Sequence, residues 1–88
     1  MSEHAAMLHI RVLFFATLRD KAGTRLLELD LAPHTTVQQL KAIVVQRLPA
    51  TSEVLEHCLA AVNHEYSDEQ AEVPPDAEVA FFPPVSGG

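Results

Sequence analysis

The first part of the chain alternates hydrophobic and polar residues with the period of two that is typical of a β-strand. One face of this predicted strand is apolar throughout and consists of Leu8, Ile10, Val12 and Phe14. The opposite face begins with His9 and Arg11 and becomes apolar at Leu13 and Phe15. The first face is therefore predicted to be core, and the apolar end of the second face is predicted to be a contact patch.

The next two segments are predicted to be a short helix and a second strand. Residues 16–22 suit a helix that ends at Gly23, because glycine accepts the left-handed conformation of a C-terminal cap. In the strand, leucines alternate with Glu28 and Asp30 over residues 27–31. The short link between the two strands indicates a hairpin.

The most regular helical pattern follows Thr36. Thr36 and Gln39 have the spacing of a capping box, and Pro49 is expected to end the helix. The apolar stripe of this helix consists of Val37, Leu40, Ile43, Val44 and Leu48. Since this spacing places the stripe on one face, the helix is predicted to lie across the sheet.

The second half of the chain is predicted to add two strands. Thr51 or Ser52 is expected to cap a short helix through His57, before a strand over residues 59–62. Residues 63–66 are interpreted as a turn, residues 67–76 as an acidic loop, and residues 78–82 as the last strand. The chain is thus predicted to be an α+β domain with one main helix packed on a mixed sheet.

The chain ends on two prolines and, three residues later, a glycine pair. Proline has no N–H to donate to a ladder, so Pro83 and Pro84 end the last strand and favour an extended path away from the domain. Gly87 and Gly88 have no Cβ and fit a narrow slot. This order predicts a terminus that is presented to another protein, with an inert frayed end as the alternative.

Length and composition favour one small domain. The 88 residues, 48% of them hydrophobic, allow a modest core. The single cysteine, Cys58, excludes an internal disulfide and favours a reducing, cytoplasmic compartment. Residues 1–6 are expected to be disordered and lack a basic export signal, and the apolar run over residues 12–18 is too short for a membrane span.

Charge is distributed unevenly along the chain. The net charge is −6, and all six lysines and arginines lie before Leu48. An acidic surface repels nucleic acid, which is therefore not an expected partner. Such a surface steers a protein toward basic partners, with simple solubility as the alternative explanation.

No residue pattern predicts a catalytic or metal site. The five histidines are not at chelating intervals, and Cys58 is predicted to be a small buried hydrophobe. The C-terminal carboxylate of Gly88 remains as the reactive group. Another enzyme would have to convert it with ATP to a mixed anhydride before sulfur displaced the activating group. The resulting thiocarboxylate would be an anionic nucleophile on a thin arm.

Three segments, residues 12–16, 59–63 and 76–88, resemble the small subunits of molybdopterin synthase, which are sulfur carriers with a ubiquitin-like β-grasp fold. The last segment is the most specific. Carriers for thiamin synthesis and ubiquitin-like modifiers share the Gly-Gly end but usually lack the Phe-Phe-Pro-Pro stem. The resemblance implies a single β-grasp domain over residues 1–88, with residues 83–88 as a projecting flexible tail.

The resemblance also implies a cycle with three protein partners. An adenylating enzyme related to ubiquitin activators uses ATP and Mg²⁺ to form the acyl-adenylate of Gly88, and a sulfur donor protein converts it to a thiocarboxylate. The tail then enters the large synthase subunit, in a heterotetramer, and sulfur passes to cyclic pyranopterin monophosphate. The tail residues are Pro83, Pro84, Val85, Ser86, Gly87 and Gly88.

The resemblance assigns Phe15, Leu59 and Phe82 to the interface with the large subunit, which holds the catalytic side chains. The chain itself is implied to be non-catalytic and to bind no cofactor or metal. Three alternatives stay open: sulfur transfer to thiazole, protein conjugation through Gly88, and a passive ubiquitin-like interaction module.

Overall fold

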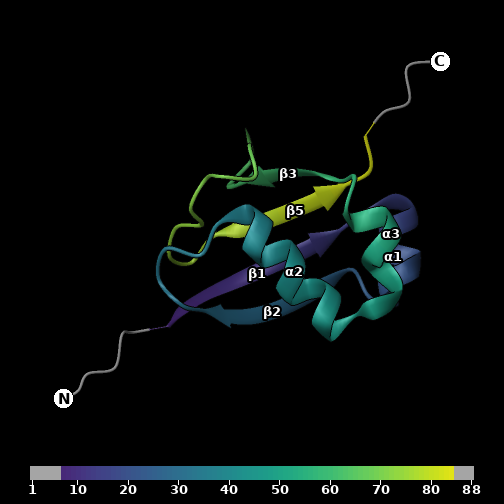
Figure 1. Ribbon diagram of the computed structural model, residues 1–88, viewed down its shortest axis with the longest axis horizontal. Coiled ribbons are helices and arrows are strands. Elements are labelled where there is room, and N and C mark those ends of the chain that lie inside the picture. Colours follow the sequence, from purple (N-terminus) through teal and green to yellow (C-terminus); the bar gives the residue numbers. More distant parts are fainter. Residues whose placement is uncertain (1–6, 85–88) are drawn as a thin grey trace.

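A computed structural model of the chain describes residues 7–84, so the predictions for residues 1–6 and for Val85, Ser86, Gly87 and Gly88 lie outside the described residues. Within this part, five strands form one sheet in the order β2-β1-β5-β3-β4 (Figure 1). The elements are β1 (Leu8–Phe14), α1 (Ala16–Ala22), β2 (Leu26–Leu31), α2 (Val37–Arg47), the 3₁₀ helix η1 (Pro49–Thr51), α3 (Ser52–Leu55), β3 (Leu59–Val62), β4 (Glu65–Ser67) and β5 (Glu78–Phe82).

The sheet is mixed, as the sequence predicts. β1 pairs with β2 in an antiparallel hairpin that encloses α1 in its connection. β5 lies between β1 and β3, parallel to the first and antiparallel to the second. Because β5 is the middle strand, the chain after Phe82 leaves from the centre of the sheet (Figure 1).

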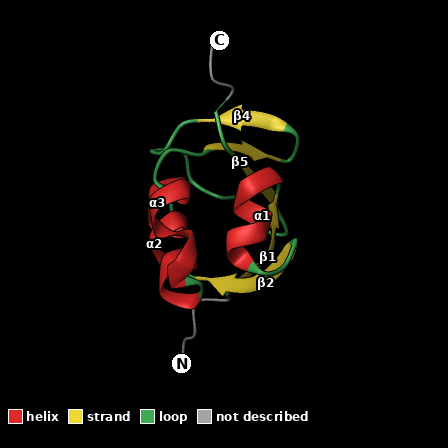
Figure 2. Cartoon of the chain, turned by 90° about the vertical axis from the view of Figure 1, so that its right-hand side faces the viewer, coloured by secondary structure: helices red, strands yellow, loops and turns green. Residues whose placement is uncertain are grey.

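The helices cover one face of the sheet. In Figure 2 the strands form an arc, and the helices lie on its concave side. The predicted capping box of α2 is confirmed, since the Gln39 N–H donates to Thr36 Oγ1 (3.2 Å) and the Thr36 N–H to Gln39 Oε1 (2.9 Å). Val37, Leu40 and Val44 are fully buried against the sheet. Gly23 caps α1 with φ 76°, as predicted.

The second short helix begins where the sequence predicts but ends earlier. Thr51, the last residue of the 3₁₀ turn η1, is the N-cap of α3, although its hydroxyl donates to the Leu48 carbonyl (2.7 Å) and makes no capping hydrogen bond to α3. α3 ends at Leu55 rather than His57. The Glu56 N–H still bonds four residues back to Ser52, whereas the N–H groups of His57 and Cys58 bond three residues back, which tightens the chain before β3.

The predicted turn over residues 63–66 is also too long. Only Asn63 and His64 form the turn, and their φ values of 50° and 73° are both positive, as a type I′ hairpin requires. The next residues form β4, which pairs with β3 and was missed. The acidic loop therefore starts after Ser67.

The core lies between the helices and the inner face of the sheet. Ile10, Val12 and Phe14 are at most 1% exposed, which confirms three residues of the apolar face predicted for the first strand, and the fourth, Leu8, is half-buried. Cys58 is buried as a small hydrophobe, also as predicted. In residues 7–84 no helix has the length and hydropathy that a membrane crossing needs.

Candidate functional site

The outer face of the sheet, opposite the helices, carries a continuous row of apolar residues. Neighbours in this row are cross-strand partners, because Leu13 pairs with both Leu26 and Ala80, Ala80 with Ala61, and Ala61 with Tyr66. Their sequence neighbours in β1, β3 and β5 are buried, so the alternation of a strand turns the row outward. We call Leu26, Leu13, Ala80, Ala61 and Tyr66 the apolar row.

The three residues that the resemblance assigns to an interface lie beside this row. Phe82 pairs with Leu59, and Phe15 follows Phe14, the residue at which β1 meets Phe81 of β5. Phe15 is 48% exposed and Leu59 is 43% exposed. Phe82 is half-buried, because the Tyr66 ring packs edge-on against it with centroids 5.7 Å apart. The register therefore brings all three to one end of the sheet.

Phe15 is exposed on the outer side, as the alternation predicts. β1 ends at Phe14 and Phe15 is the N-cap of α1, but its backbone stays extended (φ −126°, ψ 156°) and continues the alternation of the strand. Its carbonyl accepts hydrogen bonds from the Leu18 N–H (3.2 Å) and the Arg19 N–H (3.4 Å). Ala16 has φ 55°, a conformation that costs a non-glycine residue about 1–2 kcal/mol. This strained turn ends the extended backbone directly after Phe15, where α1 begins.

The other end of the outer face is charged. His9 Nδ1 lies 3.0 Å from Asp30 Oδ1 and Nε2 lies 2.8 Å from Glu28 Oε1, so both ring nitrogens face carboxylates. The hydrogen bond with Asp30, followed by that with Glu28, raises the pKa of His9. Arg11 pairs with Glu78 at 3.2 Å. These pairs satisfy one another across the strands, in contrast to the apolar row.

Pro83 and Pro84, the first residues of the predicted tail, follow β5 at the apolar end of the sheet. β5 ends at Phe82, as the prolines predict; Pro83 is half-buried and Pro84 is exposed. The other tail residues, Val85 to Gly88, lie outside the described part, and their assignment stays a prediction. The described chain thus turns toward its Gly-Gly end next to the exposed Phe15 and Leu59.

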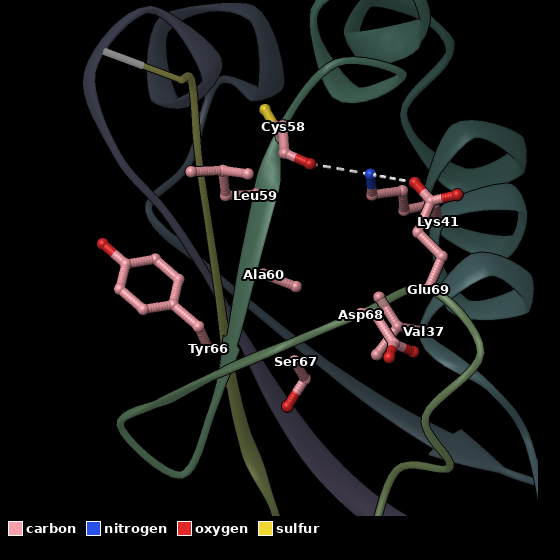
Figure 3. Close-up of a pocket in the computed structure, with 9 residues that line it drawn as sticks. All are labelled: Val37, Lys41, Cys58, Leu59, Ala60, Tyr66, Ser67, Asp68 and Glu69. Atoms are coloured by element: carbon pink, nitrogen blue, oxygen red, sulfur yellow. Dashed lines mark hydrogen bonds and ion pairs between the residues drawn. The ribbon is translucent and has the colours of Figure 1, made fainter.

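A hollow of about 410 Å³ between α2 and the β3–β4 edge was not found from the sequence (Figure 3). The buried Lys41 donates from Nζ to the Cys58 carbonyl (2.7 Å) and to Glu69 Oε2 (2.7 Å). It thereby holds the residue that precedes Leu59. The sequence shows Lys41 only as one of six basic residues, because the pattern along a helix does not reveal partners in a distant loop.

Cys58 shows no sign of nucleophilic activation. Burial raises the pKa of its thiol, and Sγ donates to the Val54 carbonyl at 3.3 Å. Within residues 7–84, no three His, Cys, Asp or Glu side chains are arranged to hold a metal ion.

Three comparisons place this fold among known proteins. Molybdopterin synthase sulfur carrier subunits are similar in sequence: one from Arabidopsis thaliana is 33% identical and covers 99% of this chain and 91% of the relative, and one from Escherichia coli (strain K12) is 38% identical and covers 90% and 99%. The crystal structure of small archaeal modifier protein 1 from H. volcanii has a TM-score of 0.80 at 28% identity, covering 89% of this chain and 99% of that one. The predicted ubiquitin-like β-grasp fold is confirmed.

The model of the ThiS family matches residues 12–88, which include the end of β1, all the later elements and the Gly-Gly end. Together with the full-length similarity to sulfur carrier subunits, this match shows that the chain belongs to the ThiS family.

Proposed function

We propose that the chain is the sulfur-carrier small subunit of a molybdopterin synthase and works in the cytoplasm. The observation that carries this proposal is the exposed apolar end of the sheet, with Phe15 and Leu59, in a chain 38% identical to a protein named for that role. An apolar surface at the base of a Gly-Gly terminus suits a domain that docks one end on a partner and extends the other into it.

The chemistry takes place at the C-terminal carboxylate. An adenylating enzyme transfers AMP from ATP to Gly88 with release of pyrophosphate, and Mg²⁺ balances the phosphate charge. A sulfur donor protein then supplies sulfur at the oxidation level of sulfide, which attacks the Gly88 acyl carbon, expels AMP and leaves a thiocarboxylate. In the large subunit, the thiocarboxylate sulfur replaces an oxygen substituent on the side chain of cyclic pyranopterin monophosphate and forms a thioester. Water then hydrolyses the thioester, so the sulfur stays on the pterin for the dithiolene and Gly88 returns as a carboxylate. The chain itself supplies the carrier and no catalytic side chain.

Docking and tail insertion depend on each other. Burying Phe15, Leu59 and Phe82 on the large subunit is worth about 1.5–3 kcal/mol per side chain. Ordering the backbone of residues 83–88 costs about 1–2 kcal/mol per residue, less for the prolines. Since the two terms are of the same order, backbone hydrogen bonds along the tail are expected to supply the net affinity.

Intact-mass measurement tests the carrier role. The chain is incubated with the adenylating enzyme, ATP, Mg²⁺ and a sulfur donor. We expect the mass to increase by the difference between one sulfur and one oxygen. A chain without Gly88 is the matched control and is expected to stay unloaded while it binds the large subunit nearly as tightly. Loading of the shortened chain, or no loading of the full chain, contradicts the proposal.

A second candidate is protein conjugation through Gly88. The similarity to small archaeal modifier protein 1, with a TM-score of 0.80, favours this alternative. It predicts isopeptide-linked adducts when the chain, ATP and the adenylating enzyme are mixed with a cell extract without pterin. Sulfur transfer to thiazole differs from the proposed function in the molecule that accepts the sulfur. A passive interaction module would differ because its Gly88 would not be loaded with sulfur.

A further inference from the structure

A hollow of about 380 Å³ adjoins the apolar row at the end of β1. Leu13 and Leu26 belong to both the row and the hollow, and Phe15 lines the hollow as well. Two cationic side chains, Arg19 and Arg25, complete this side of its wall. The apolar end of the sheet is thus bordered by two guanidinium groups.

The backbone holds both arginines in place. Arg19 lies on α1, where its carbonyl accepts the Gly23 N–H at 3.0 Å. The Arg25 carbonyl, just before β2, accepts the Phe14 N–H at 3.0 Å. Their side chains are exposed, and both also line a neighbouring hollow with Asp20. The two charges are therefore anchored to the elements that also place Phe15.

Neither arginine has a carboxylate partner in the described part of the chain. The ion pairs between described residues involve His9, Arg11, His34 and Lys41 as cations, and Asp20 is not within ion-pair distance of either guanidinium. Across the sheet, at the hollow beside β4, Lys41 is already paired with Glu69. Lys21 and Arg47 also make no ion pair between described residues, but only Arg19 and Arg25 line the hollow beside the apolar row.

The local charge is opposite to that of the whole chain. A net charge of −6 favours a basic partner, but the partner that covers the apolar row meets two cations at its edge. Arginine forms paired hydrogen bonds to carboxylates with defined geometry, and such charges at an interface edge select partners and speed association.

We propose that Arg19 and Arg25 are a docking site for carboxylates of the protein that covers the apolar row. This inference rests on the proposed function, in which that protein is the large synthase subunit. The large subunit then carries acidic side chains beside its apolar contact surface. These contacts are distinct from the insertion of the tail, so they set affinity and specificity without touching the sulfur.

The test is a binding titration against purified large subunit. The double variant Arg19→Gln/Arg25→Gln is compared with Lys21→Gln/Arg47→Gln, which removes the same charge at exposed residues that do not line the hollow. We expect the dissociation constant to rise about tenfold in the first variant and less than about threefold in the second. The difference should shrink as salt is added.

A third variant, Arg19→Lys/Arg25→Lys, keeps the charge but removes the paired geometry. We expect its affinity to lie between those of wild type and the glutamine variant. Thermal unfolding is measured for every variant, and equal melting temperatures are expected because both side chains are exposed. If the glutamine variant has a lower melting temperature than wild type, only the lysine variant is used to judge the proposal. A lysine variant that binds the large subunit as tightly as wild type then refutes the paired hydrogen bonds between arginine and carboxylate.

The outcomes separate the two proposals. If the glutamine variant and its charge-matched control bind equally, or if the glutamine variant binds more tightly, the arginine site is refuted while the carrier role stands. If the wild-type chain does not bind the large subunit at all, the proposed function fails and the arginine site fails with it.

Discussion

The two ends of the outer sheet face are built from the same strands but have opposite chemistry. At one end His9, Glu28 and Asp30 satisfy one another, as do Arg11 and Glu78. At the other end the apolar row has no cover in the described part of the chain, and Phe15 and Leu59 are exposed. Polar groups that already pair with one another gain little free energy when a partner binds. An exposed apolar end, in contrast, gains free energy when a partner buries it.

The largest effect on stability is expected at Phe81, which lies on the inner face of β5 next to Phe82 on the outer face. Phe81 is fully buried and Phe82 is half-buried on the opposite side. Phe81→Ala is expected to lower the free energy of unfolding by about 3–5 kcal/mol, because it leaves a cavity in the core. Denaturant unfolding measures this loss. A change below that of Phe82→Ala contradicts the assigned faces.

Phe82→Ala is expected to act on binding rather than on folding. Loss of its burial on the large subunit should weaken binding by about 1.5–3 kcal/mol, or about 10- to 100-fold. Titration calorimetry measures the affinity, and the unfolding midpoint of the same sample is the control. Unchanged affinity would remove Phe82 from the docking surface.

Lys41→Met sharpens the comparison at the β3 edge. The substitution keeps the length of the side chain but leaves the Cys58 carbonyl and Glu69 without their cation. We expect a loss of about 1–3 kcal/mol in unfolding free energy, because a buried carbonyl loses its hydrogen bond. Glu69→Gln is the matched control, since it keeps the Cys58 contact. Equal losses in the two variants would show that the buried carbonyl contributes nothing.

The smallest effect is expected at the charged end and depends on pH. The folded pKa of His9 is raised above its ordinary value of 6.5, so protonated His9 is bound more favourably in the folded state. Its stabilisation is therefore fully present below the unfolded pKa and is lost as pH rises through the folded pKa. His9→Gln should be less stable than wild type at low pH and equal to it above that range. A deficit that persists at high pH would assign the effect to packing.

Much of the fold follows from local patterns in the sequence. The alternation in β1, the capping box of α2 and the glycine cap of α1 each depend on residues close together in the chain, and all three are confirmed. β4 was missed because three residues, Glu65 to Ser67, are too few to show a period. A two-residue hairpin turn with asparagine first was the available signal, since asparagine tolerates the positive φ that Asn63 adopts.

The candidate site was predicted only in part, because register is not a local property. The resemblance supplied Phe15, Leu59 and Phe82, but only the folded sheet shows that Phe82 lies beside Leu59 and packs against the Tyr66 ring. Two other features are also hidden from local patterns. Lys41 contacts a residue that is distant in sequence, and Ala16 adopts a positive φ that its residue type does not predict. The assignment of the tail, including Gly88, stays a prediction.

Molybdopterin formation in a reconstituted synthase tests whether Gly88 carries the sulfur to the pterin. The chain is loaded with sulfur and mixed with the large subunit and cyclic pyranopterin monophosphate, in parallel with a chain whose Gly88 carboxylate is blocked as an amide. The account predicts dithiolene formation with the first chain and none with the second. Equal product from the blocked chain would contradict it.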